Sequence, residues 1–415
     1  MSLAITGAVL NGEVVGLRVE GERIAEIGPD VQGRNGDELI DAAGGALVAG
    51  LVNGHTHAAM TLFRGYGDDL PLMRWLEEKI WPVEARLEPE DVYWGTRLAC
   101  AEMIRTGTVR FWDMYWHPEA AGRAVSDAGL HATCAAPLID ANRSVDDARE
   151  GALRSLEAVA ELGGLVVAGL APHSIYTVSE GSLRWVAELA SERRVPVQIH
   201  LSETEAEVRA CLESHGERPA GYLDRVGLLG PDTVLGHGVW LARSELELIA
   251  ERGATVVTNP VANLKLAVGA VFPYPEAREA GVAVGLGTDG PGSNNSLDLF
   301  DDVKTFALLA KHAAGDPAAV TAAEAWEIAT GRRAPALGAS GRLEPGEPAD
   351  FLLLSPNLPE LSLGALDAGL VYAASGSVVD TTVVGGRVLM RHGVVEGVEE
   401  IVARARERAA RLGIA

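Results

Sequence analysis

The middle of this chain, roughly residues 51–340, alternates short apolar runs with amphipathic segments of helical period. Such an alternation predicts strand–helix repeats around a parallel sheet. Eight apolar runs are strand candidates, at residues 45–55, 108–114, 131–138, 166–173, 196–202, 233–238, 254–260 and 282–289. Helices are predicted at residues 90–106, 145–163, 179–194, 204–215, 243–252, 275–280 and 299–313. Eight repeats in one stretch predict an α/β fold of the (β/α)₈ TIM-barrel type.

Both ends of the chain differ from this middle part. Residues 1–50 alternate apolar and polar side chains and contain hairpin-type turns such as Asn11-Gly12. Residues 349–355 and 378–396 show the same strand-like pattern. We therefore predict one small β-sandwich from residues 1–50 and 342–397, flanking a barrel domain at residues 51–341. The charged amphipathic residues 398–415 predict a C-terminal surface helix.

Charge and cysteine content exclude several classes of protein. The formal net charge is −23, which disfavours nucleic acid and anionic membranes as partners. No apolar run approaches the ~18 residues of a membrane span, and the N-terminus lacks the pattern of a signal peptide. Three widely spaced cysteines without a CxxC argue against a disulfide framework, so we expect a cytoplasmic protein. A homo-oligomer is compatible with the sequence, which does not fix the oligomeric state.

Polar side chains end several of the predicted strands. His55 and His57 are two residues apart, so on an extended strand both imidazoles face the same side. His200 and Asp289 end two further strands. The carboxyl ends of barrel strands meet at one mouth, where these side chains would form a His₃Asp site. Such ligands suit one divalent metal ion, with Zn²⁺ expected and Fe²⁺ or Mn²⁺ as alternatives.

Two further residues near these strand ends are suited to proton transfer. Glu203 follows His200 by three residues and could reach a substrate rather than the metal. A solvated loop glutamate is the alternative interpretation. His237 lies between two glycines at the end of a predicted strand. It could be a core histidine, or it could stabilise a developing oxyanion.

The motifs together resemble those of a known family. They are GLVNGHTHAAMTLFRG (50–65), IWPVEARL (80–87), APHSIYTVS (171–179), QIHLSETEAEV (198–208), LGHGVWL (235–241), TNPVANLKLAVG (258–269) and GLGTDGPGSNNSLDLF (285–300). The chain resembles the amidohydrolase superfamily over essentially its whole length. Within it, the chain is similar to adenosine-type deaminases acting on S-adenosylhomocysteine and 5′-methylthioadenosine, which are related to triazine chlorohydrolases.

The resemblance implies roles for named residues. His55, His57, His200 and Asp289 fall on the metal ligands of the family, and Glu203, His237 and Asp289 fall on its proton-handling residues. For the substrate, Glu84 falls where the family binds ribose hydroxyls and His173 falls on another contact. Trp75 would line the pocket.

One segment departs from the family pattern. Relatives that hold the charged tail of S-adenosylhomocysteine have basic residues just after the strand near residue 137, where this chain has Ala135-Ala136-Pro137-Leu138. The nearby arginines are Arg143 and Arg149, of which Arg149 is the candidate substrate contact. Binding of that tail is therefore in doubt, and adenosine or 5′-methylthioadenosine becomes a comparable candidate.

The lysines favour a single metal ion. Binuclear relatives need a carboxylated lysine between two metals, and none of the four lysines lies at the end of a central strand. They are Lys79, Lys265, Lys304 and Lys311.

We therefore predict a mononuclear, metal-dependent hydrolase of carbon–nitrogen bonds in cyclic amidines. Its substrate would be adenosine, 5′-methylthioadenosine or S-adenosylhomocysteine, which it would convert to ammonia and the inosine analogue. One alternative is a hydrolase of another N-heterocycle, such as a guanine, 8-oxoguanine or pterin deaminase or a triazine chlorohydrolase. A second alternative is a non-catalytic metal-binding interaction protein.

Overall fold

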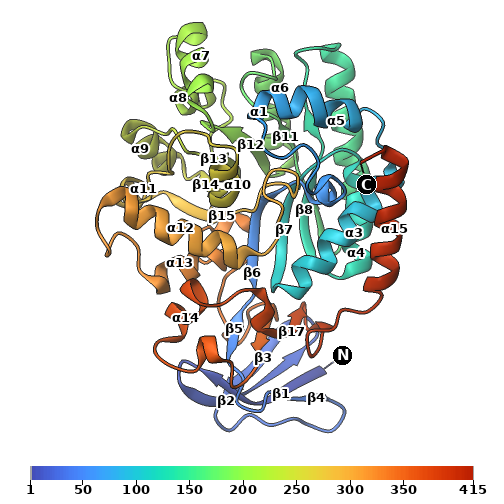
Figure 1. Ribbon diagram of the computed structural model, residues 1–415, viewed down its shortest axis with the longest axis vertical. Coiled ribbons are helices and arrows are strands. Elements are labelled where there is room, and N and C mark those ends of the chain that lie inside the picture. The colour runs from blue at the N-terminus through green and yellow to red at the C-terminus, as the bar shows by residue number, and fades with distance from the viewer. Residues whose placement is uncertain (1, 415) are drawn as a thin grey trace.

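A computed structural model describes residues 2–414 and shows a mixed α/β fold (Figure 1). Each of the eight predicted apolar runs contains at least one strand. The runs at 131–138 and 166–173 are each split into two short strands. The strands of this central part are β6 (Leu51–Thr56), β7 (Thr108–Met114), β8 (His131–Ala135), β9 (Pro137–Leu138), β10 (Val166–Ala168), β11 (Ala171–Pro172), β12 (Val197–Leu201), β13 (Thr233–His237), β14 (Thr255–Thr258) and β15 (Ala283–Leu286).

Parallel hydrogen-bonded ladders connect these strands. β6, β7, β8 and β10 form one sheet, and β12 to β15 form a second. Between the two sheets lie the parallel pair β9–β11 and a parallel bridge from Leu170 to Val197. At the other side, the Asp289 N–H donates to the His55 carbonyl at 3.0 Å, which joins the end of β15 to β6. Because the ladders are parallel, the carboxyl ends of neighbouring strands lie at the same edge.

Seven helices match the predicted amphipathic segments. They are α3 (Pro89–Arg105), α5 (Val145–Ala160), α6 (Glu180–Arg193), α7 (Glu205–His215), α9 (Arg243–Arg252), α11 (Tyr274–Ala280) and α12 (Leu299–Ala314). Further helices that the sequence analysis did not predict are α4 (Pro118–Ala128), α8 (Pro219–Arg225), α10 (Pro260–Lys265), α13 (Ala322–Ala329) and α14 (Leu366–Tyr372). In α4 the buried positions are mostly alanine and glycine, small side chains that do not stand out as an apolar run in the sequence.

The segment between β6 and α3 is largely helical. A 3-10 helix, η1 (Ala58–Phe63), follows β6 directly. Farther along, α1 (Leu72–Trp75), the π-helical turn η2 (Leu76–Ile80) and α2 (Trp81–Glu84) run on without a break. The helical backbone is continuous because the Leu76 N–H donates to Leu72 and the Trp81 N–H donates to Leu76. We call residues 72–84 the cover helix.

The two ends of the chain meet in β-structure, at the bottom of Figure 1. β1 (Ser2–Leu10), β2 (Glu13–Glu20), β3 (Arg23–Gly28) and β4 (Glu38–Asp41) form one sheet in the order β3-β2-β1-β4. β5 (Leu47–Ala49), β16 (Phe351–Leu354), β17 (Val379–Val384) and β18 (Arg387–Met390) form another, in the order β18-β17-β16-β5. Ile5, Leu17 and Phe351 belong to one buried cluster between residues of both sheets. Segments more than 300 residues apart therefore share a sheet and a core.

The last helix, α15 (Val398–Leu412), packs along α3 (Figure 1). Its Arg411 Nε donates to the Asp91 carboxylate at 3.1 Å, and Asp91 is fully buried at the start of α3. The predicted surface helix is therefore tied to the central part by an ion pair. Short 3-10 turns complete the chain, at η3 (Pro335–Leu337), η4 (Pro359–Leu361) and η5 (Gly376–Val378).

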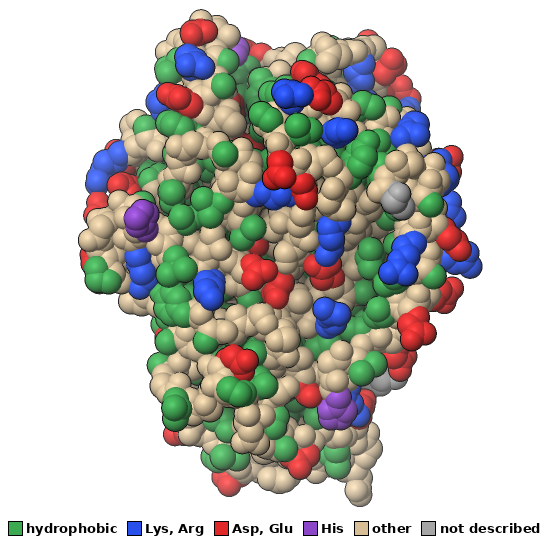
Figure 2. Space-filling model, viewed as in Figure 1, with side chains coloured by type: hydrophobic (Ala, Val, Ile, Leu, Met, Phe, Trp, Pro, Cys, Tyr) green, Lys and Arg blue, Asp and Glu red, His purple; other side chains and the backbone are tan. Residues whose placement is uncertain are grey.

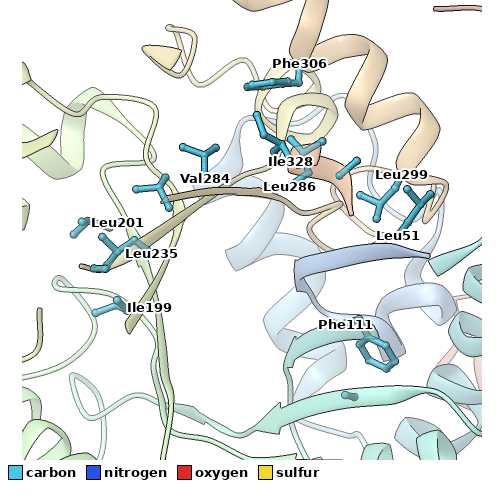
Figure 3. Packing of buried hydrophobic residues seen from close by; sticks show 14 of the residues in the cluster. Leu51, Phe111, Ile199, Leu201, Leu235, Val284, Leu286, Leu299, Phe306 and Ile328 are labelled. Carbon is cyan, nitrogen blue, oxygen red and sulfur yellow. The ribbon is translucent and has the colours of Figure 1, made fainter. Parts of the chain in front are cut away.

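The main hydrophobic core lies between the central strands and the surrounding helices. Figure 3 shows Ile199 of β12 close to Leu235 of β13, its ladder partner, with Leu286 of β15 near Ile328 of α13. Burying one such side chain stabilises the fold by about 1.5–3 kcal/mol. This packing fixes the strands, and it thereby fixes the residues at their ends.

The outer surface carries both charges. Figure 2 shows acidic and basic side chains interspersed over this face rather than gathered into one patch. Within residues 2–414, no helix combines the length and apolar character that crossing a membrane requires. The three cysteines, Cys100, Cys134 and Cys211, are free and buried.

Candidate active site

The polar strand ends that the sequence analysis singled out converge at one place. His55 and His57 come from β6 and the residue that follows it, His200 from β12 and His237 from β13, and Asp289 follows β15. His55, His200, His237 and Asp289 are each at most 5% exposed. One ligand atom from each of these four lies within 4.8 Å of the other three. This group can therefore hold a metal ion.

His57 adjoins this group, which contains His237 where we predicted His57. The His57 Nε2 lies 3.1 Å from Asp289 Oδ1 and 3.4 Å from His200 Nε2. His55 Nε2 lies slightly farther from the same carboxylate oxygen, at 3.6 Å. Three of the four predicted ligands thus belong to this group, and His57 lies beside it through its contacts with Asp289 and His200.

The imidazoles are oriented by partners at their other ring nitrogen. His57 Nδ1 lies 2.6 Å from the Met114 carbonyl, and His200 Nδ1 lies 2.8 Å from the His173 carbonyl. A carbonyl only accepts, so both Nδ1–H groups donate and both Nε2 atoms face the group. Orientation of this kind is typical of histidines that bind metals.

A buried nitrogen without a partner supports the same interpretation. His55 Nδ1 faces the Gln198 side-chain oxygen at 3.4 Å, whereas His55 Nε2 is buried and has no hydrogen-bond partner among residues 2–414. An unpaired buried polar atom costs about 1–3 kcal/mol. A cation bound at Nε2 would remove that cost, so the residues present fit a metal.

Burial sets the protonation of these groups. It lowers the pKa of His55 to about 4 and that of His200 well below its usual value, which leaves both imidazoles neutral at pH 7. Neutral imidazole is the form that binds metals. Burial also opposes protonation of His57, but Asp289 beside it raises the pKa of His57 to about 9. The His57 and His55 contacts hold the pKa of Asp289 well below its usual value in spite of burial.

Asp289 is held by several independent contacts. Ser293 Oγ donates to Asp289 Oδ2 at 2.6 Å, and Thr56 Oγ1 donates to the Asp289 carbonyl at 2.8 Å. Asp289 and His237 both adopt left-handed backbone, with φ of 58° and 72°. Such conformations cost about 1–3 kcal/mol in non-glycine residues and cluster at functional sites. The carboxylate is therefore positioned by its surroundings rather than by local preference.

Glu203 is part of the same pocket and is not a solvated loop residue. It is 7% exposed, and its Oε2 lies 3.9 Å from His237 Nε2. Burial, helped by the charge of Asp289, raises the pKa of Glu203 to about 8. The loop is fixed by Glu207, which accepts the backbone N–H groups of Ser202 and Glu203. A buried carboxyl that holds a proton near neutral pH can act as a general acid.

These groups open into one pocket of about 750 Å³, which includes open solvent at its mouth. The predicted residues Glu84, His173 and Trp75 all line it, together with His57, His200, Glu203, His237 and Asp289. Glu84 comes from the end of the cover helix, and burial raises the pKa of its carboxyl. The structure therefore brings together residues from six separate segments of the chain.

Arg149 lies elsewhere. Its Nε donates to Ser182 Oγ at 3.0 Å, and its guanidinium lies over the Trp185 ring, 5.6 Å from the centroid. It is not among the residues that line the pocket. Both contacts hold Arg149 between α5 and α6, so the structure does not bring this predicted substrate contact to the others.

Several residues of the site were missed from the sequence. Gln198, Asn263 and Ser293 contact His55, His237 and Asp289 respectively. Gln198 could have been found, because it precedes His200 by two residues on a strand and so shares its face. Asn263 and Ser293 sit on α10 and on a loop, where no period indicates which side chain turns inward.

Comparisons with known proteins agree with this geometry. A model of the amidohydrolase family matches residues 46–389. A 5′-deoxyadenosine deaminase of Methanoregula boonei is 47% identical over 94% of this chain and 90% of its own length. A 5-methylthioadenosine/S-adenosylhomocysteine deaminase of Archaeoglobus fulgidus is 41% identical over 95% and 94%. A crystal structure of an adenosine deaminase from Xanthomonas campestris with bound zinc superposes with a TM-score of 0.92, at 34% identity, covering 100% of this chain and 98% of that one.

Proposed function

The chain belongs to the amidohydrolase family, and on that premise we propose that it is a metal-dependent hydrolytic deaminase of adenosine-type nucleosides. It would replace the exocyclic amine of the adenine ring by oxygen and release ammonia. The convergence of Glu203, His237 and Asp289 beside three further imidazoles carries the proposal. The names of the relatives at 41–47% identity support the choice of substrate class.

We propose the architecture in finer detail as well. The parallel ladders that run from β6 to β15, and the contact of β15 with β6, support an eight-stranded TIM barrel at residues 51–341. The two four-stranded sheets with a shared core support a β-sandwich from residues 1–50 and 342–397. Of the segment predicted at 398–415, residue 415 lies outside the described residues, and α15 (Val398–Leu412) would be the surface helix. The free cysteines suit a cytoplasmic protein.

For the metal we propose His55, His57, His200 and Asp289 as the residues that hold one divalent ion. Imidazole and carboxylate ligands suit zinc, and the similar adenosine deaminase contains zinc. When bound, such a metal would supply Lewis-acid chemistry that makes water a nucleophile near neutral pH. His237 would remain outside the ligand set, since its Nε2 faces Glu203.

The side chains of the pocket divide the proton transfers between them. Asp289 takes a proton from the attacking water as the bond from oxygen to ring carbon C6 forms. Glu203 gives a proton to ring nitrogen N1, so no bare ring anion develops. His237 steadies the added oxygen through Nε2. Asp289 then passes its proton to the amine, and the C6–N bond breaks to release ammonia. The remaining hydroxyl proton returns to Glu203 as the C6 carbonyl of the inosine analogue forms.

For the substrate we propose that Glu84 accepts hydrogen bonds from ribose hydroxyls and that His173 contacts the base. Glu84 lines the pocket beside Tyr115 and Trp116, whose contacts with its carboxyl partly oppose the rise in its pKa. Its carboxyl oxygens can accept from ribose hydroxyls, a contact that a free base or a chlorotriazine cannot make, so the position favours a nucleoside.

A substrate panel tests the proposal. We expect ammonia release, with the inosine-type product, from adenosine, 5′-deoxyadenosine and 5′-methylthioadenosine. Glu84→Ala should lower kcat/KM for these nucleosides by about tenfold or more and leave any activity on free adenine unchanged. Ammonia from guanine or a pterin alone, or chloride from a chlorotriazine alone, would overturn the assignment. Bound metal without hydrolysis of any of these compounds would favour a non-catalytic protein.

A further inference from the structure

The cover helix presents a regular apolar face to the pocket. Leu72, Leu76 and Ile80 follow each other at intervals of four residues, and Glu84 continues the series. All four line the pocket. Residues four apart lie on one side of a helix, so the three apolar side chains and the carboxylate form one line. We call Leu72, Leu76 and Ile80 the apolar ridge.

The apolar ridge leads away from the point where the ribose would be held. A regular α-helix would rise about 18 Å between Glu84 and Leu72, and the π-helical turn η2 shortens this somewhat. A nucleoside with its base at Glu203 and its hydroxyls at Glu84 would therefore extend its 5′ group along the apolar ridge. The lining also includes apolar side chains from other segments, namely Trp116, Ile139 and Leu266.

Cations are held away from this part of the pocket. Along its described lining there is neither a lysine nor an arginine. Arg74 on the cover helix is paired with Glu78 at 2.8 Å, and Lys265 is paired with Asp68 at 2.7 Å. Lys79 lies over the Tyr66 ring, 5.8 Å from the centroid. A carboxylate carried on the 5′ group would thus enter an apolar channel without a cation to pair with.

We propose that the apolar ridge is the specificity surface for the 5′ substituent, so that the enzyme selects nucleosides with an uncharged 5′ group and disfavours those with an amino-acid tail. This inference rests on the proposed deaminase function and deepens it. 5′-Deoxyadenosine and 5′-methylthioadenosine bury an apolar 5′ group against the ridge. S-adenosylhomocysteine must either strip water from the two charges of its amino-acid tail or keep that tail outside the pocket.

The first test compares substrates on the metal-loaded wild-type protein. We expect kcat/KM for 5′-methylthioadenosine to exceed that for S-adenosylhomocysteine by about tenfold or more. Equal values for the two would overturn the inference while leaving the deaminase function intact. Failure of every nucleoside to release ammonia would instead overturn the proposed function, and the inference with it.

The second test alters the apolar ridge itself. Leu76→Ala should lower kcat/KM for 5′-methylthioadenosine by about fivefold, mainly through KM, because about three buried carbons are lost. Leu76→Arg should raise the S-adenosylhomocysteine to 5′-methylthioadenosine ratio by about tenfold. Met73→Ala and Met73→Arg are matched controls, since Met73 is 46% exposed on the same helix and does not line the pocket.

A variant of Arg143 is the most direct test that could contradict the inference about the apolar ridge. Its Nε donates to the carbonyl of Ile139, a residue that lines the pocket, and its side chain is exposed. If Arg143 binds a charged tail at the mouth, Arg143→Ala will lower activity on S-adenosylhomocysteine alone, by about tenfold. That result would overturn the inference. We expect Arg143→Ala to change all substrates by less than about twofold.

Discussion

The floor of the pocket and its cover helix are built in opposite ways. The floor consists of side chains at strand ends that are almost fully buried and whose partners fix their orientation. We define it as His55, His200, His237 and Asp289. Along the cover helix, Leu72 and Leu76 are only half-buried, and Trp81 is 38% exposed. Packing of the central strands holds the floor in place, which matters because a misplacement of about 1 Å can cost about 10²-fold in rate. The cover helix supplies contact area, which decides what the floor can act on.

The largest effect should come from removing the proton donor of the floor. Glu203→Gln preserves the shape of the side chain but cannot deliver a proton to the ring, so kcat should fall by about 10²–10⁴-fold. Metal content, measured by elemental analysis, should stay unchanged because the ligand residues are intact. Glu205→Gln is the matched control, since Glu205 is exposed two residues away. Near-normal turnover by Glu203→Gln would show that the floor does not work as we propose.

A smaller loss should follow from loosening the floor without removing a reacting group. Ser293→Ala deletes the hydroxyl that donates to Asp289 Oδ2 at 2.6 Å. Supporting hydrogen bonds of this kind contribute about 10–100-fold to metal affinity or activity. We expect kcat to fall within that range with KM little changed, and metal to dissociate more readily in a competition assay. An unchanged metal affinity together with an unchanged kcat would count against a positioning role for Ser293.

Changing the cover helix should affect binding more than chemistry. Trp75 is 6% exposed, lines the pocket and lies close to Gly292, where an added Cβ atom would meet its ring at 3.0 Å. Trp75→Leu should raise KM for 5′-deoxyadenosine by about tenfold and change kcat by less than about threefold. Trp94→Leu on α3 is the control, because Trp94 does not line the pocket. A larger effect on kcat than on KM would remove the distinction between floor and cover helix.

The smallest effect concerns Asp298, at the start of α12 and outside the pocket. Its titration should change the free energy of unfolding with pH without changing the site. Burial, helped by Asp301 and Glu102, raises the pKa of Asp298 to about 6. Asp298 caps α12 and also accepts the Gly376 N–H at 2.8 Å. The pKa of Asp298 is higher in the folded protein than in the unfolded chain. The stability that Asp298 contributes is therefore present below about pH 4 and is lost as pH rises through about 6.

Asp298→Asn removes this titration. The free energy of unfolding should then vary less between pH 4 and 6 than in the wild type, by about 1 kcal/mol once solvent screening of a partly exposed group is allowed for. Differential scanning calorimetry at several pH values measures this. An identical pH dependence in both proteins would show that Asp298 is not raised in the folded state.

The floor could be predicted from the sequence because its residues obey local rules. His55, His57 and His200 follow apolar runs, and parallel strands must bring their ends to one edge. Gln198 obeys the same two-residue period, although it was overlooked. The cover helix follows a different rule, since its period of four in Leu72, Leu76 and Ile80 is visible but does not say what the face covers. The displacement of Arg149 from the pocket depends on Ser182 and Trp185, which are far along the chain.

The measurement that bears most directly on the shared metal site is a metal titration followed by ammonia release from 5′-deoxyadenosine. Protein stripped by a strong chelator should be inactive, and activity should return in proportion to added Zn²⁺ until one equivalent is bound. His57→Ala should fail to recover, whereas His237→Ala should bind one equivalent and remain slow. Full activity after rigorous chelation, or recovery that requires two equivalents, would contradict the account.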